Sequence, residues 1–196
     1  RLLILKNFSK KLIDVAQQAP ETVFLAEDEA GLYLQATTCR VWYPTGQTPV
    51  VRVDAGRAST HFYGSINLLT GEEIAMRSDL MNSEVSVEYL QMILNTIPNL
   101  PILMLWDRAP WHRGKVVKKF LEDNPRLEVI YFPPGCPELN PQEHVWKEVR
   151  KAVSHNHIIK KLPELAECFL EKLNAGIFNT TFMDKYGATP VLTMFK

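Results

Sequence analysis

Residues 129–146 read VIYFPPGCPELNPQEHVW, and the rest of the chain can be arranged around this stretch. The apolar run Val129–Phe132 predicts a short buried strand. Two prolines and a glycine follow and end it, because proline cannot donate to a sheet ladder. Asn140 and Pro141 then predict a helix start, with Asn as the N-cap and Pro at the first helical position. We therefore expect a strand–loop–helix unit that holds Glu143, in the first helical turn, beside a strand end.

The remaining patterns predict an α/β domain. The run Pro101–Trp106 is continuously apolar, as expected of a central strand buried on both faces. Gly31 permits a turn between the first two strands. Strands are expected at Thr22–Ala26, Leu32–Thr38, Val50–Val53, His61–Leu69 and Leu127–Phe132. Helical spacing predicts helices at Leu2–Ala19, Ser83–Ile97, His112–Asp123, Asn140–Val153 and Leu162–Asn174. Early hairpins followed by strand–helix–strand crossovers favour a mixed sheet with helices on its faces.

The bulk composition is that of one ordinary globular domain. The chain has 196 residues, no formal net charge and three cysteines without a CxxC pair. This cysteine usage argues against a disulfide scaffold and fits a reducing compartment, and no apolar run approaches a membrane span. Residues 105–161 carry 11 Lys/Arg against 7 Asp/Glu, whereas residues 1–104 carry 8 against 11. A basic segment of this kind hints at a phosphate-binding face, although a solvated helix surface explains it equally well.

Three acids occupy comparable points in the predicted fold. Asp28 ends the first strand, Asp107 ends the central strand, and Glu143 begins the helix after the next strand. In open α/β sheets, active sites form beyond strand ends. Carboxylates that lie close together repel unless a proton or a cation lies between them, and oxygen-only ligands suit Mg²⁺ or Mn²⁺. Two such ions roughly 3.5–4 Å apart can hold the attacking and leaving oxygens of a phosphodiester.

Each acid also has an ordinary structural explanation. Asp28 lies between Glu27 and Glu29, and an acidic turn after a strand is common. Glu143 could serve only to complement the helix dipole. Asp107 is harder to explain in this way, because a charge at the end of a doubly buried strand needs a partner.

Four motifs, taken together, resemble one family. They are Asp28-Glu29 after an apolar strand, Trp42-x-Pro-x-Gly46, Asp107-x-Ala-Pro-Trp-His112, and the run from Pro137 to Trp146. In this order they resemble the DDE-type transposases of the mariner-like insertion-sequence superfamily, from Thr22 to about Ala152. The 35 residues between Asp107 and Glu143 are close to that family's spacing.

The resemblance implies a ribonuclease-H-like fold, here a mixed five-stranded sheet with helices on both faces. It implies that Asp28, Asp107 and Glu143 are the catalytic, metal-binding triad of a two-metal Mg²⁺ or Mn²⁺ site. The implied reaction is hydrolysis of a phosphodiester at each transposon end, after which the freed 3′-hydroxyl attacks target DNA. The implied partner is double-stranded DNA, both terminal inverted repeats and target, and the need to handle two DNA ends suggests a homodimer. In a prokaryote such a protein is expected in the cytoplasm, associated with the nucleoid.

Two departures from the family pattern keep a second hypothesis open. The family usually has Asn after its second Asp, whereas this chain has Arg108, which could contact a phosphate or pair with an acid. Only residues 1–21 precede the first predicted strand, where the family carries a helix-turn-helix region. We therefore expect a fragment of something longer, with a linker-helix remnant at 1–20 and a catalytic domain at 21–196. The alternative is a catalytically inactive, domesticated DNA- or protein-binding module; a junction-resolvase-like nuclease is disfavoured by the run from Pro137 to Trp146.

Basic side chains flank two of the three acids, which suits a phosphate track. The resemblance puts His112 near the site, to contact DNA or help order the metal shell; otherwise it is a polar residue at a helix start. Trp111 and Trp146 are expected to pack between helix and sheet, and no zinc site is expected at His155 and His157. The candidate DNA-binding residues are Arg108, His112, Arg113, Lys115, Lys118, Lys119, Lys147, Arg150 and Lys151.

Overall fold

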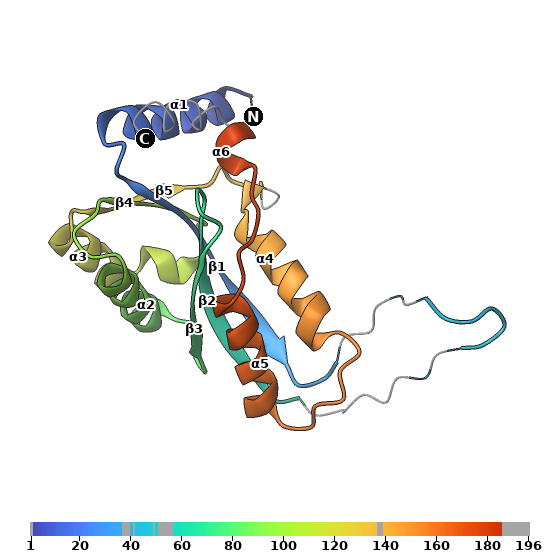
Figure 1. The fold of residues 1–196 in the computed structure, drawn as a ribbon. Coiled ribbons are helices and arrows are strands. Elements are labelled where there is room, and N and C mark those ends of the chain that lie inside the picture. The colour runs from blue at the N-terminus through green and yellow to red at the C-terminus, as the bar shows by residue number, and fades with distance from the viewer. Residues whose placement is uncertain are drawn as a thin grey trace.

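The computed structural model describes residues 2–36, 40, 42–48, 50, 57–136 and 139–185, and its centre is one mixed sheet. The strands are β1 (Val23–Tyr33), β2 (Ser59–Asn67), β3 (Glu73–Ser78), β4 (Ile102–Trp106) and β5 (Leu127–Tyr131). They form a five-stranded sheet in the order β3-β2-β1-β4-β5 (Figure 1). The pairs β1–β2 and β2–β3 are antiparallel, whereas β1–β4 and β4–β5 are parallel. The predicted mixed five-stranded sheet is therefore confirmed.

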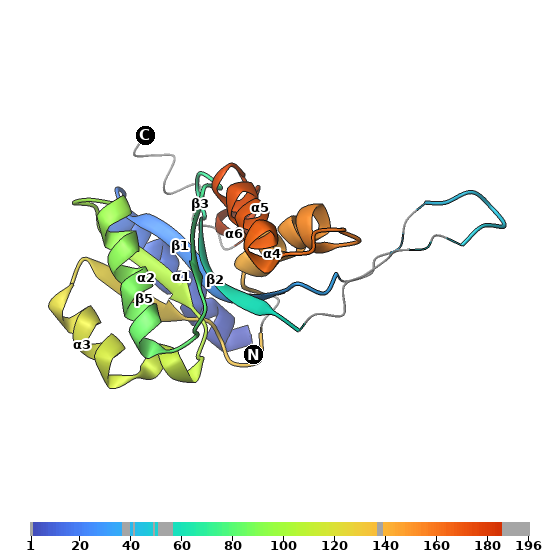
Figure 2. The same cartoon turned by 90° about the horizontal axis from the view of Figure 1, so that it is seen from below.

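Helices cover both faces of this sheet. The helical elements are α1 (Leu2–Gln18), α2 (Ser83–Thr96), η1 (Pro110–Arg113), α3 (Lys115–Asp123), α4 (Gln142–Val149), the π-helical turn η3 (Arg150–Ser154), α5 (Leu162–Asn174) and α6 (Phe182–Lys185). Seen from below, α2 and α3 lie on one side of the sheet and α4 and α5 on the other (Figure 2). Two buried apolar clusters correspond to these two layers, one beneath α2 and α3 and one beneath α1, α4 and α5. No helix among the described residues combines the length and apolar character needed to cross a membrane.

Alternation along β1 decides which face each of its acids joins. Phe24 and Ala26 are buried in the cluster beneath α4 and α5, whereas Leu25 is buried in the cluster beneath α2 and α3. Successive side chains of a strand point to opposite faces of the sheet. Asp28 therefore falls on the α4 face, and Glu27 and Glu29 fall on the α2 face.

The N-terminal helix belongs to the same core as β1. Phe8, Leu12 and Ala16 recur at helical spacing and are buried. The Phe8 ring lies 6.0 Å from the Phe132 ring, which follows β5. The predicted division of the chain at residue 20 stays a prediction, but the buried face of α1 packs directly on the domain.

Three sequence-based expectations about element bounds are wrong. β1 does not turn at Gly31; it continues to Tyr33 and pairs with β2, with Gly31 opposite His61. Glycine permits a turn without requiring one, and here the long ladder with β2 is the alternative. The helix expected from His112 begins only at Lys115, after the short turn η1, and the helix expected over Asn140–Val153 becomes α4 and η3.

Four other elements have bounds that agree with the prediction. α5 has the predicted bounds, and α2, β4 and β5 agree with the prediction to within one residue. The short strand β3 was not anticipated. The strand expected at Leu32–Thr38 is absent as a separate element among residues 32–36, because 32–33 belong to β1. Residues 37–39 and most of the strand expected at Val50–Val53 lie outside the described residues.

Candidate active site

The three predicted acids come from three different elements and line one cleft. Asp28 lies in β1, Asp107 directly follows β4, and Glu143 lies in the first turn of α4. Ala26 pairs with Leu105 in the parallel β1–β4 ladder, and continuing this register by two residues sets Asp28 beside Asp107. The cleft has a volume of about 230 Å³ and is also lined by Arg108, Phe132, Pro133, Pro134, Gly135, Cys136 and Asn140. The fold therefore brings together acids that are far apart in the sequence.

Asn140 attaches the start of α4 to β1. Its Oδ1 accepts a hydrogen bond from the backbone N–H of Gln142 at 3.1 Å, as expected of a residue that caps a helix start. Its Nδ2 donates to the backbone carbonyl of Glu27 at 3.0 Å. The sequence predicted Asn140 as the N-cap and Pro141 as the first helical residue; in the structure α4 begins at Gln142 with Pro141 at the cap position, so Asn140 bonds the helix start from one residue earlier. The bond to Glu27 was not predictable locally, and it holds Glu143 beside the strand that carries Asp28.

Asp28 is largely buried and surrounded by other carboxylates. Burial, followed by the charges of Glu143, Glu29 and Asp107, raises its pKa to about 7. The indole N–H of Trp146 donates to Asp28 Oδ2 at 3.2 Å. The predicted packing role of Trp146 is confirmed, since its side chain is buried against Phe169, but this hydrogen bond was not foreseen.

The pKa of Asp107 is shifted in the opposite direction, below its ordinary value. Its partial burial would raise the pKa, but hydrogen bonds from His112 and from the backbone N–H of Ala109 lower it overall. Asp107 Oδ1 lies 2.7 Å from His112 Nδ1 and 2.8 Å from the Ala109 nitrogen. The Asp107 side chain is 47% exposed, so an ionised carboxylate faces the cleft. One acid is thus kept ionised beside another whose pKa is high.

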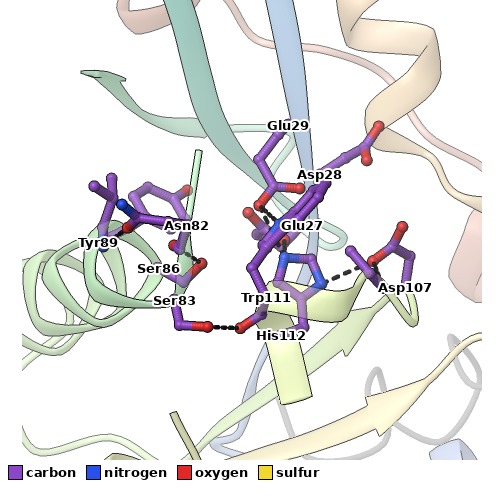
Figure 3. Close-up of polar contacts among 12 residues, drawn as sticks. Glu27, Asp28, Glu29, Asn82, Ser83, Ser86, Tyr89, Asp107, Trp111 and His112 are labelled. Atoms are coloured by element: carbon purple, nitrogen blue, oxygen red, sulfur yellow. Dashed lines mark hydrogen bonds and ion pairs between the residues drawn. The ribbon is translucent and has the colours of Figure 1, made fainter. Parts of the chain in front are cut away.

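His112 connects Asp107 to the opposite face of β1. Its Nε2 lies 2.8 Å from Glu29 Oε1, and Glu29 also accepts from the indole N–H of Trp111 at 2.7 Å (Figure 3). The imidazole is stacked on Trp106 with ring centroids 3.8 Å apart. Burial alone would lower the pKa of His112, but the bonds to Asp107 and Glu29 raise it overall. Its side chain is fully buried, so the expected contact with DNA is not available to it.

Glu27 is the most deeply buried acid of the site. Burial, then the charges of Glu29 and Asp28, raises its pKa well above the ordinary value, and the nearby Trp106 offsets this only in part. No described residue makes a hydrogen bond of ordinary geometry to either carboxylate oxygen. Neither Glu27 nor Glu29 was predicted as a site residue. Their signal was present, because a buried strand that continues through three consecutive acids must bury acids on both faces.

The distances between ligand atoms differ between the predicted triad and the group formed by Glu27, Glu29 and His112. Among the described residues, Glu27, Glu29 and His112 form the group whose ligand atoms all lie within 4.8 Å of one another. The carboxylates of Asp28, Asp107 and Glu143 line one cleft without meeting that spacing. They do not converge on a single ion as they stand.

The predicted basic track divides between the two faces of the sheet. Arg113, Lys115, Lys118 and Lys119 belong to η1 and α3, whereas Lys147, Arg150 and Lys151 belong to α4 and η3, on the other side (Figure 1). Arg150 donates to the carbonyl of Gly31 at 3.3 Å, and Lys119 is paired with Asp123 at 3.3 Å.

Arg108 lines the cleft itself. Its Nε donates to the carbonyl of Phe132 at 3.4 Å, and its guanidinium lies 5.4 Å from the centre of the Tyr131 ring. These contacts draw Arg108 toward β5 and the residue after it.

Comparison with known proteins agrees with the motifs. Residues 23–166 match the family described as "DDE superfamily endonuclease". The chain is 23% identical over 132 residues to the "Insertion element IS630 uncharacterized 39 kDa protein" of Shigella sonnei, which covers 67% of this chain and 38% of that protein. The chain therefore spans well under half the length of that relative.

Solved structures share the fold. The chain in "Mos1 transposase paired-end complex with left transposon end" has a TM-score of 0.68 at 14% identity, covering 98% of this chain and 62% of that one. "Crystal structure of the catalytic domain of Mos1 mariner transposase" has a TM-score of 0.58 at 13% identity, covering 96% and 87%. These likenesses confirm the predicted ribonuclease-H-like fold. Because the family match covers most of its length, the chain belongs to the DDE superfamily endonucleases.

Proposed function

We propose that this chain is the catalytic domain of a DNA transposase, which cleaves DNA strands at transposon ends and joins them to target DNA. In this proposal Asp28, Asp107 and Glu143 are the metal-binding catalytic triad. The observation that carries it is that acids from β1, from the end of β4 and from the start of α4 line a single cleft. Membership of the DDE superfamily endonucleases supports the reaction class.

The cleft suits divalent cations of the Mg²⁺ or Mn²⁺ type. The three acids offer only oxygen ligands, in an open cleft that leaves room for water and phosphate. The charges of Glu143 and Asp107 help to raise the pKa of Asp28, so a cation there would relieve carboxylate repulsion. When bound, such ions would polarise the scissile phosphate and activate the attacking hydroxyl.

The protein's own contribution in this proposal is to hold the three carboxylates. Trp146 orients Asp28 through its indole N–H. His112 and the Ala109 amide keep Asp107 ionised and restrict its rotation. Asn140 fixes the first turn of α4, and with it Glu143, to β1. Such positioning accounts for much of the rate enhancement available to phosphoryl transfer.

Double-stranded DNA is the proposed partner. Two sets of exposed cations lie close in sequence to the acids. One set follows Asp107 and consists of Arg113, Lys115 and Lys118; the other follows Glu143, in α4 and the turn after it, and consists of Lys147 and Lys151. These side chains would contact phosphates on the two sides of the cleft, so binding should weaken steeply as salt is added.

The test is cleavage of supercoiled plasmid DNA in Mn²⁺, which needs no knowledge of the terminal repeats. We expect Asp107→Ala to abolish nicking while the circular dichroism spectrum is unchanged. Asp123→Ala is the matched control, because Asp123 is an exposed acid of α3 that pairs with Lys119 away from the cleft. Nicking by Asp107→Ala at the wild-type rate would remove the proposal.

A non-enzymatic binding module of the same fold is the second candidate. Arg108 favours it, since this exposed cation lines the cleft in which a metal ion would have to bind. Calorimetric titration with Mn²⁺ separates the two candidates. Binding that is lost in Glu143→Gln counts against the module, because a protein that only binds DNA has no use for cations between these acids.

A further inference from the structure

A second group of ligating side chains lies behind the cleft, on the α2 face of the sheet. Glu27, Glu29 and His112 have side chains that are 0%, 4% and 0% exposed. None of the three lines the cleft that contains Asp28 and Asp107. Figure 3 shows His112 between Asp107 on one side and the carboxylates of β1 on the other. The proposed catalysis uses this group only through the contact of His112 with Asp107.

Glu27 supplies the observation that points to a ligand. Its carboxylate is wholly buried, with the Trp106 side chain nearby as a donor, but neither oxygen has a hydrogen-bond partner of ordinary geometry among the described residues. A buried carboxylate without a partner is costly, and proteins ordinarily pair it or coordinate a metal with it. Its Oε2 points toward His112 and lies 3.9 Å from Nε2.

His112 is oriented as a metal ligand would be. Its Nδ1 lies 2.7 Å from Asp107 Oδ1 and its Nε2 lies 2.8 Å from Glu29 Oε1, so both ring nitrogens face carboxylates. With a cation bound between Glu27 and Glu29, a neutral imidazole that keeps its proton on Nδ1 would donate to Asp107 and present the lone pair of Nε2 to the ion. Histidine ligands commonly donate their other ring N–H to a carboxylate in this manner, which fixes the tautomer. Donors around one ion at roughly 2.0–2.2 Å lie about 3–4.4 Å apart. The Nε2–Glu27 separation of 3.9 Å falls in that range, whereas the Nε2–Glu29 separation of 2.8 Å is a hydrogen-bond distance, so Glu29 would have to move back by a few tenths of an ångström when a cation enters.

We propose that Glu27, Glu29 and His112 form a buried second metal site that takes one first-row divalent cation, such as Mn²⁺ or Zn²⁺, in preference to Mg²⁺. The imidazole nitrogen gives the preference, because Mg²⁺ favours oxygen ligands and retained water. The ion satisfies Glu27 and, through the Nδ1–H of His112, holds Asp107 in place. The site therefore acts on the cleft as a positioning element and does not itself contact DNA.

The test uses the nitrogen ligand as its signature. The full chain is produced in medium with added Mn²⁺ and purified without imidazole in excess Mg²⁺, which fills the oxygen-only cleft. Pulsed electron paramagnetic resonance then detects ¹⁴N coupling to any retained Mn²⁺. We expect coupling in the wild type and in Asp28→Asn, whose altered side chain faces the other side of the same strand. We expect complete loss of that signal in Glu27→Gln and in Glu29→Gln, which preserve side-chain volume.

Two results would overturn the site. One is a wild-type protein without nitrogen-coupled Mn²⁺, as expected if a proton rather than a cation satisfies Glu27. The other is coupling that persists in both glutamine variants, since an adventitious ion on another histidine would not respond to them. Circular dichroism of each variant shows that its fold is retained. Either failure is independent of the proposed function, which is judged by plasmid nicking in Asp107→Ala.

Discussion

Replacing Asn140 by Ala tests whether α4 is attached to β1 as described. The change removes the cap to the Gln142 N–H and the bond to the Glu27 carbonyl, at a residue that is only 7% exposed. Loss of a helix N-cap costs about 1 kcal/mol, and leaving a buried carbonyl without its donor costs about 1–2 kcal/mol more. We therefore expect the free energy of unfolding to fall by about 2–3 kcal/mol.

Urea denaturation followed by circular dichroism measures this loss. The matched control is Asn82→Ala, which removes the cap of α2, where Asn82 Oδ1 accepts from the Val85 N–H at 2.9 Å. That variant loses a cap without a cross-link to β1, so we expect a fall of only about 1 kcal/mol. If Asn140→Ala costs no more than Asn82→Ala, the bond between α4 and β1 contributes nothing and the reasoning fails.

Two further predictions concern the same region. The pKa of Asp28 is raised from 3.8 to about 7, so its carboxyl destabilises the fold increasingly as pH rises through that interval. Thermal melts in chelator should show Asp28→Asn more stable than the wild type above pH 7 and no advantage below pH 4; an equal difference at both ends would contradict the pKa. Gly64 lies opposite Asp28, and an added Cβ would collide with Glu73, Gln142 and Trp146. Gly64→Ala should lower stability by about 1–3 kcal/mol in urea titrations. The control Gly31→Ala, whose Cβ meets the Tyr33 ring at an ordinary 3.5 Å, should cost less, and the reverse order would refute the close packing.

The sequence by itself determined the elements whose signals are local. The apolar run before Asp107 predicted β4, and every residue of that strand is buried. Helical periodicity predicted α2 and α5, because a helix places residues three and four apart on one face whatever it packs against. The order and spacing of the motifs around Asp28, Asp107 and Glu143 were sufficient to predict the family. These acids also share a cleft, as predicted, but Asp28 lies inside β1, which continues to Tyr33, and does not end the strand as the sequence had suggested.

The tertiary structure alone decided which side chains meet across the sheet. β1 passes its glycine without turning because β2, distant in sequence, offers a continuous ladder of partners. In that register Asp28 faces α4, whereas Glu27 and Glu29 face His112. His112 is therefore buried between carboxylates and is not exposed for contact with DNA. The tertiary structure also puts the predicted basic track on two faces of the sheet, because α3 covers one face and α4 and η3 cover the other. A local sequence pattern shows that side chains alternate along a strand, but it does not show which residue pairs with which on the neighbouring strand. That register is fixed only when the partner strands and the covering helices are in place.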